Sequence, residues 1–315
     1  MEYRKLGRSG VRVSEVALGS WLTYGRSVDA QGAKAVIRRA YELGINYFDT
    51  ANVYAGGEAE RIVGEALTEM PRDRIVLATK VFFPMGEHPN QSGLSRKHVL
   101  EQIDGSLGRL GVDYVDIYFA HRFDEDTPLD ETLRAFDDLV RAGKVLYVGV
   151  SEWSANQMME AHALSERMGL DLIVVNQPSY NMLRRNIEKD VLPTCRKLGI
   201  GQVVFSPLAQ GVLTGKYSGG KTPAGTRGAD PEVEGRFMGA HLNEDTLARV
   251  DRLAPIAADL GMTMPQLALA WCLRQDNVAS VICGAKTPEQ IADNAGASGK
   301  TIPPDALRKI DDILS

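Results

Sequence analysis

The sequence predicts an α/β fold, a single (β/α)8 TIM barrel over residues 1–315, with a β-hairpin at its N-terminal end and a helix at its C-terminal end. Short apolar runs alternate with amphipathic stretches, and the runs are nearly continuous, as in parallel strands that are buried on both faces. No linker divides the chain. Eight strand–helix units within 315 residues, 44% of them hydrophobic, favour one closed barrel.

The predicted elements follow one another in a regular order. A hairpin over residues 3–6 and 11–13 comes first, around a turn at residues 8–10. Between the strands, apolar side chains recur at helical spacing, for example at Val99, Ile103 and Leu107, so each helix has one face to bury. The strands are eight short apolar runs, at residues 16–18, 47–48, 75–79, 114–119, 145–150, 172–175, 203–205 and 280–282.

A doubly wound nucleotide-binding sheet also alternates strands and helices, but its phosphate-binding turn is missing here. The first strand is followed by residues 19–25, which read Gly-Ser-Trp-Leu-Thr-Tyr-Gly and lack the G-x-G-x-x-G pattern. We therefore expect any dinucleotide to be held in another way.

Two longer segments interrupt the alternation of strands and helices. Residues 84–93 follow the third strand, and residues 207–242, with eight glycines, follow the seventh. A loop of that length is typically a lid or a mobile segment, and its place after the seventh strand favours a lid.

Composition excludes several classes of protein. The net charge is −5, and no basic block is present that could bind a nucleic acid. Three widely spaced cysteines without a C-x-x-C pair argue against a disulfide framework or a thiolate metal site. No apolar run approaches the ~18 residues needed for membrane insertion. These features predict a cytoplasmic protein without a thiolate metal site.

Polar side chains follow three successive predicted strands, where a barrel of this kind carries its active site. Asp49 and Tyr54 come after the second strand, Lys80 ends the third and His121 follows the fourth. Carbonyl reduction adds hydride to carbon while negative charge grows on oxygen, so a nearby acid must supply a proton. We expect Tyr54 to be that acid, with the ammonium of Lys80 lowering its pKa. Asp49 would keep Lys80 charged, and His121 would donate to the carbonyl oxygen.

Each of these four residues also has an ordinary structural interpretation. Asp49 could cap a turn, and Tyr54 could be a half-exposed aromatic residue. Lys80 could extend its charge to solvent, and His121 could bond a loop carbonyl. Their joint placement at three successive strand ends favours catalysis.

These residues also carry a resemblance to a known family. Residues 49–54, Asp-Thr-Ala-Asn-Val-Tyr, with Gly-Gly-Glu at 56–58, Thr-Lys at 79–80 and His121, resemble the Asp, Tyr, Lys, His tetrad of the aldo-keto reductase superfamily. Residues 206–217 and 267–274 are similar to the branch that contains potassium-channel β subunits and bacterial glyceraldehyde-3-phosphate or methylglyoxal reductases. The resemblance covers nearly the whole chain.

The resemblance implies an NADPH-dependent enzyme, without a metal, that reduces small aldehydes, α-oxoaldehydes or ketones. It also implies a second class, a cofactor-sensing auxiliary subunit similar to potassium-channel β subunits. Channel β subunits have Asn at the fourth position of the tetrad, whereas this chain has His121, which favours the enzyme. By analogy with this branch a homo-oligomer is also expected.

The same resemblance implies that NADPH lies across the barrel mouth. Ser151 and Gln177, together with Asn176, would bond the nicotinamide carboxamide, and Phe205 would stack on the ring. The long loop and the stretch after the eighth strand would supply the phosphate and adenosine contacts, through Ser206, Leu208, Gly211, Lys216, Arg227, Gly284, Lys286, Gln290 and Asn294. Lys216 and Arg227 could instead belong to a solvated lid surface.

Two positions depart from the family pattern. Gln290 stands where relatives often have an Arg that binds phosphate, and Glu152 stands where many have Asn. The preference for NADPH would then rest on Lys286 and Arg227, and use of NADH stays open. For the substrate, Trp21, Tyr24 and Phe82 are expected to form a mostly apolar wall.

Overall fold

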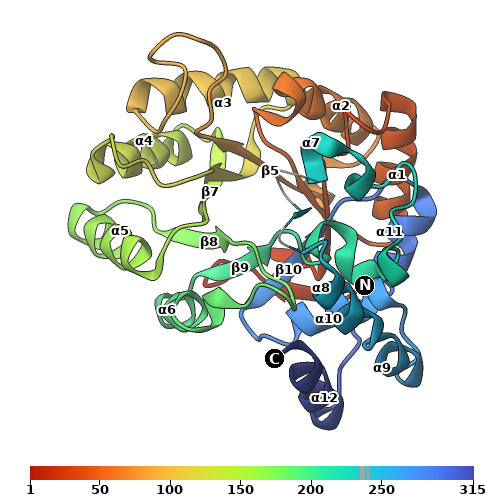
Figure 1. Ribbon diagram of the computed structural model, residues 1–315. Coiled ribbons are helices and arrows are strands. Elements are labelled where there is room, and N and C mark those ends of the chain that lie inside the picture. Colours follow the sequence, from red (N-terminus) through yellow and green to blue (C-terminus); the bar gives the residue numbers. More distant parts are fainter. Residues whose placement is uncertain (235–237, 240) are drawn as a thin grey trace.

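A computed structural model describes residues 1–234, 238–239 and 241–315 of the chain. Within these residues, eight parallel strands close into a barrel in the order β10-β3-β4-β5-β6-β7-β8-β9, and helices surround it (Figure 1). The predicted (β/α)8 barrel is therefore confirmed. The strands are β3 (Val16–Gly19), β4 (Tyr47–Asp49), β5 (Val76–Val81), β6 (Val115–Ala120), β7 (Val145–Ser151), β8 (Ile173–Gln177), β9 (Gly201–Val204) and β10 (Val278–Cys283).

The predicted N-terminal hairpin is present as β1 (Tyr3–Lys5) and β2 (Arg12–Ser14), paired antiparallel. Leu6 and Val13 are fully buried in the same cluster as side chains from inside the barrel. At Gly7, an added Cβ would lie 2.5 Å from the backbone nitrogen of Gly201, at the start of β9. The hairpin therefore covers the N-terminal end of the barrel and leaves the other end open for a site.

The helices carry the amphipathic patterns that the sequence predicts. On α3, for example, Val99 and Ile103 are buried, and α5 begins with a capping box formed by Ser154 and Gln157. The helices are α1 (Ala30–Glu42), α2 (Glu58–Leu67), α3 (Arg96–Leu110), α4 (Leu129–Arg141), α5 (Ala155–Met168), α6 (Val191–Leu198), α7 (Pro231–Val233), α8 (Glu244–Asp251), α9 (Ala254–Asp259), α10 (Met264–Leu273), α11 (Pro288–Ala295) and α12 (Pro304–Leu314).

No single helix of the described residues is both long and apolar enough to cross a membrane. One pair, Glu244–Asp259 with Met264–Leu273, passes the same test together but is bent by 87°. Within the same residues, no group of three or more His, Cys, Asp or Glu side chains could hold a metal ion.

The long segment after β9 folds into short helical turns, including 3-10 turns at Ala209–Thr214 and Arg227–Ala229, followed by α7. Its residues 235–237 and 240 lie outside the described part of the chain. An ion pair of 2.7 Å between Arg26 and Glu232 joins α7 to the loop after β3. Both residues line the cavity described below, so the segment lies beside the barrel mouth.

Candidate active site

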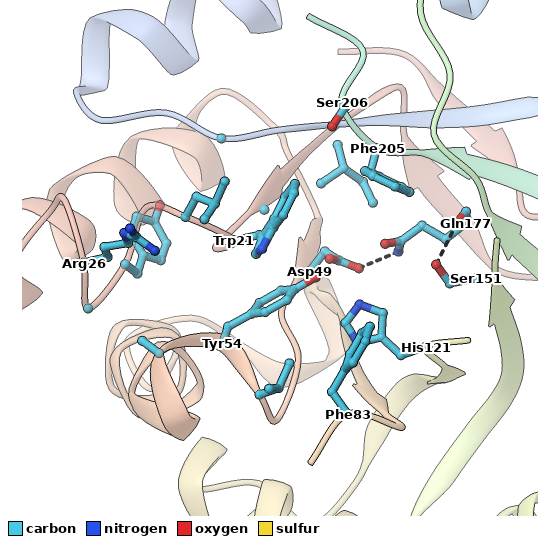
Figure 2. A pocket seen from close by; sticks show the side chains of 18 of the residues that line it. Trp21, Arg26, Asp49, Tyr54, Phe83, His121, Ser151, Gln177, Phe205 and Ser206 are labelled. Carbon is cyan, nitrogen blue, oxygen red and sulfur yellow. Dashed lines mark hydrogen bonds between the residues drawn. The ribbon is translucent and has the colours of Figure 1, made fainter. Parts of the chain in front are cut away.

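A cavity of about 660 Å³ lies at the ends of the barrel strands. Its lining residues come from the ends of β3, β4, β7, β8 and β10 and from the loops that follow the strands (Figure 2). Trp21, Phe83 and Phe205 give it apolar walls, and Asp49 and His121 give it polar groups. An apolar cleft with a few convergent polar groups at this end of a barrel is typical of an active site.

Asp49 and Lys80 form a buried ion pair at the base of the cavity. The Lys80 ammonium is fully buried and donates to Asp49 Oδ1 and, at 2.7 Å, to the carbonyl oxygen of Thr50. The second carboxylate oxygen of Asp49 accepts from the Gln177 side chain at 2.8 Å. Burial lowers the pKa of Lys80, and the charge of Asp49 opposes that shift. The pair thus has two further hydrogen-bond partners, the Thr50 carbonyl oxygen and the Gln177 side chain.

Tyr54 begins a 3-10 turn, Tyr54–Gly57, that connects β4 to α2. Ala55 and Gly57 have φ values of 50° and 95°, so the chain turns sharply just after the tyrosine. At Gly57 an added Cβ would lie 2.8 Å from Cδ of Arg109, and only glycine fits both the angle and the space. The turn directs the ring of Tyr54 toward the cavity (Figure 2).

The ring of Tyr54 is close to two other members of the predicted tetrad, Lys80 and His121. Its centroid is 5.1 Å from the Lys80 ammonium nitrogen and 5.7 Å from the His121 ring. Burial raises the pKa of Tyr54 well above its usual value, and the charge of Asp49 raises it further. The sequence predicts a lowered pKa for Tyr54, but the net shift is upward, because burial and the charge of Asp49 dominate while Asp49 also pairs with Lys80. The phenol keeps its proton at neutral pH.

His121 follows β6 directly, and its backbone N–H donates to the Val81 carbonyl oxygen at 2.9 Å. Its side chain is buried, with the ring edge-on to Phe83 at 4.9 Å between centroids. Burial lowers the pKa of His121 well below its usual value, and the charges of Lys80 and Arg122 lower it further. The imidazole is therefore neutral at neutral pH.

The residues predicted to hold the nicotinamide divide into two groups. Ser151, Gln177 and Phe205 line the cavity, and Ser151 Oγ donates to the backbone oxygen of Gln177 at 2.9 Å. Asn176 does not line it, because its side chain is fully buried and donates to Gln202 Oε1 at 3.1 Å. Ser151 and Gln177 therefore lie side by side in the cavity wall, where both could bond one carboxamide group.

Three predicted phosphate contacts, Lys216, Arg227 and Lys286, form a group of cations. None of the three has a carboxylate within 4 Å among the described residues. Arg227 donates to Gln210 Oε1 at 2.5 Å, and Lys286 donates to the Gly225 carbonyl oxygen at 2.9 Å. Burial and the charges of Arg227 and Lys286 lower the pKa of Lys216 to about 8. Uncompensated positive charge of this kind suits a phosphate.

Of the remaining cofactor candidates, Gly211, Gly284 and Gln290 lie beside this cation group. Gly211 has a φ of 101°, and an added Cβ would lie 2.6 Å from the Lys216 ammonium nitrogen. Gln290 accepts from the Lys286 backbone N–H at 2.8 Å, while Thr287 caps α11. Ser206 and Gly284 line the cavity. Leu208 and Asn294 do not line it: Leu208 is half-buried, and Asn294 is buried on α11.

The structure modifies the predicted substrate wall. Trp21 and Tyr24 line the cavity, but Phe82 packs against the hydrophobic core, and its neighbour Phe83 lines the cavity instead. The sequence does not separate the two phenylalanines, because both lie in an irregular loop beyond β5. Sequence analysis also missed other lining residues: Arg26, Pro84, Arg122, Gln210 and Glu232.

Backbone strain is concentrated at this end of the barrel. Among the described residues, positive φ outside glycine occurs at Leu22, Ala55, Glu152, Ser206, Ala209 and Gln210. Each of these lines the cavity or adjoins a residue that does. Glu152, which departs from the family pattern, accepts from the Ser179 backbone N–H at 2.5 Å and so ties the end of β7 to the segment after β8. Strain of this kind is typical of functional sites.

Comparison with known proteins shows the family of the chain. Residues 15–315 match the aldo/keto reductase family. A protein of Oryza sativa subsp. japonica named "Probable voltage-gated potassium channel subunit beta" is 43% identical over 319 residues, covering 100% of this chain and 97% of the relative. A protein of the same name from Arabidopsis thaliana has the same identity and coverage. A "Putative voltage-gated potassium channel subunit beta" from Schizosaccharomyces pombe is 43% identical over 322 residues, covering 99% and 93%.

The match covers nearly the whole chain and agrees with the closed barrel. The chain therefore belongs to the aldo/keto reductase family and is an NAD(P)H-dependent oxidoreductase.

Proposed function

We propose that the chain is an NADPH-preferring reductase of small aldehydes, α-oxoaldehydes and ketones, with Tyr54 as the proton donor. The observation that carries the proposal is the grouping of a protonated phenol, a neutral imidazole and a buried ammonium–carboxylate pair around one apolar cavity. A carbonyl that is being reduced needs a proton at oxygen and a low-polarity surrounding, and this group offers both.

Tyr54 and His121 would act together on the carbonyl oxygen. The bound cofactor would supply hydride to the carbonyl carbon. The raised pKa of Tyr54 keeps its O–H bond intact at neutral pH, so the phenol can release a proton to oxygen as charge grows there. A neutral His121 can donate through an N–H to the same oxygen and orient it. Lys80, 5.1 Å from the Tyr54 ring centroid, would stabilise the phenolate left behind until a proton returns.

The cation group supports NADPH over NADH. Lys216, Arg227 and Lys286 carry charge that no described carboxylate neutralises, and only NADPH has a 2′-phosphate to bind there. The buried hydroxyl of Tyr24, which lines the cavity without a hydrogen-bond partner among the described residues, also fits a polar ligand. Ser151 and Gln177 would bond the carboxamide, with Phe205 against the ring.

An assay of NADPH oxidation over a panel of aldehydes, α-oxoaldehydes and ketones, against a control without substrate, tests the proposal. We expect turnover that depends on the carbonyl compound and is lost in Tyr54→Phe. Oxidation no faster than the control with every carbonyl would contradict it.

A second candidate is a cofactor-sensing auxiliary subunit. The names of the three relatives, at 43% identity, favour it. Such a subunit needs the cofactor site but not efficient turnover, so His121 in the cavity favours the enzyme.

Assembly into a homo-oligomer would suit either role, and sedimentation velocity would measure the oligomeric state. We place the protein in the cytoplasm, where its three buried, unpaired cysteines would stay reduced.

A further inference from the structure

Arg122 follows His121 directly and lines the cavity beside the predicted tetrad. Its guanidinium donates to the His121 carbonyl oxygen at 2.5 Å, and the same nitrogen is 3.5 Å from Ser151 Oγ. The group lies 5.4 Å from the ring centroid of Phe83, which is itself packed edge-on to His121. These contacts fix the half-buried guanidinium in the wall of the cavity.

The charge of Arg122 has no acidic partner. No Asp or Glu of the described residues lies within 4 Å of it. The nearest acid along the chain, Asp124, accepts instead from the Leu94 backbone N–H at 2.6 Å and from Thr127 Oγ1 at 2.7 Å.

Arg26 gives a comparison within the same cavity. It also lines the wall, but it is paired with Glu232 at 2.7 Å and with Asp230 at 3.6 Å. Of these two cavity arginines, Arg122 therefore has the charge that is free to meet a ligand.

We propose that Arg122 is a specificity-determining residue that selects carbonyl substrates bearing an anionic oxygen group, a carboxylate or a phosphate. The inference rests on the proposed reductase function. A guanidinium presents several N–H donors in one plane, which matches the oxygens of either group. Because Arg122 adjoins His121, an anion held there would bring its carbonyl toward Tyr54 and His121. The apolar walls at Trp21 and Phe83 would hold the carbon skeleton between the two ends.

Matched substrate pairs test the proposal. We would compare 3- and 4-carboxybenzaldehyde, each with its own methyl ester, and glycolaldehyde phosphate with glycolaldehyde. The quantity measured is the ratio of kcat/KM for the anionic member to that for the neutral member, which cancels changes in cofactor binding. The carboxylate and phosphate pairs show separately which anion is preferred.

In Arg122→Met we expect this ratio to fall by about tenfold or more in at least one pair, because a charge-assisted contact is lost. In Arg122→Lys the ratio should fall less, since lysine keeps the charge without the planar donors. Arg26→Met is the matched control and should leave the ratio unchanged, because that charge is already paired.

An unchanged ratio in Arg122→Met, with the rates for both members reduced together, would overturn the proposal. It would mean that Arg122 acts on the tetrad through its charge, which also lowers the pKa of His121. A shift of the pH profile with the neutral ester would identify that role directly. Circular dichroism checks that each variant folds. If the wild type reduces neither member of any pair, the reductase proposal itself fails, which is a different outcome.

Discussion

The side-chain amide of Gln177 donates a 2.8 Å hydrogen bond to Asp49, between residues at the ends of β8 and β4 on opposite sides of the barrel. Asp49 thus accepts from Lys80 on one oxygen and from Gln177 on the other, and Figure 2 shows the bond from Gln177. This hydrogen bond therefore joins Gln177, which we propose to bind the carboxamide, to Asp49 of the proposed proton-transfer group.

Replacing Gln177 with Leu should lower the free energy of unfolding by about 1–3 kcal/mol, because a buried carboxylate oxygen loses its donor. Urea denaturation measures the change. Gln177→Glu should cost at least as much, since it places a second carboxylate against Asp49. Stability equal to wild type in both variants would show that the bond contributes nothing to the fold.

Replacing Tyr54 with Phe should abolish carbonyl reduction while leaving NADPH affinity nearly unchanged, because the phenol acts in the transition state. Steady-state kinetics and a fluorescence titration of NADPH measure the two quantities. Turnover near the wild-type rate would remove Tyr54 from its proposed role.

Replacing Arg227 and Lys286 with Ala should weaken NADPH binding at least about tenfold more than NADH binding, because only NADPH carries the 2′-phosphate. Calorimetric titration with both cofactors measures the difference. Equal losses for the two cofactors would place the phosphate pocket elsewhere.

The affinity for NADPH should decline as the pH rises through about 8. The pKa of Lys216 is lowered to about 8, so the side chain is a cation below that pH and loses its charge above it. A bound phosphate favours the ammonium, and binding near pH 8 should therefore take up a proton. Titrations from pH 7 to 9.5 test this, with Lys216→Met as the variant in which the decline should vanish. A decline that persists in Lys216→Met would assign it to another group.

Replacing His121 with Asn should lower kcat/KM for aldehydes about tenfold, because the shorter amide can still donate but is less well placed. Cofactor affinity should survive. An auxiliary subunit would behave differently, with very slow turnover in the wild type that the substitution leaves unchanged. Kinetics of both proteins over several aldehydes, with NADPH affinity measured separately, distinguish the two roles.

Most of the fold could be predicted from the sequence, because buried parallel strands require apolar runs and the helices between them require one apolar face. Strand limits were less accurate: β9 begins at Gly201, two residues before its predicted start. The two added residues, Gly201 and Gln202, pair with Val175 and Asn176 of β8, and the sequence alone does not show this pairing.

The positions of the tetrad could also be predicted, because strand ends in a barrel share one face. Its electrostatics could not. The pKa of Tyr54 depends on how deeply the ring is buried and on Asp49, which requires three-dimensional distances. Arg122 was missed because a lone arginine in a loop is usually solvated, and only the structure shows that it lacks an acidic partner.

The strained backbone lies in the loops at the open end of the barrel, so these loops and the barrel strands should differ in their tolerance to substitution. A non-glycine residue in the left-handed region costs about 1–2 kcal/mol, so the loops at Leu22, Ala55 and Gln210 are maintained by the strands beneath them. Glycine at such a position would relieve the strain, but it would also loosen the loop and raise the conformational entropy of the unfolded chain. Substitutions at these positions therefore change the loops around the cavity and leave the buried strands beneath them unaltered.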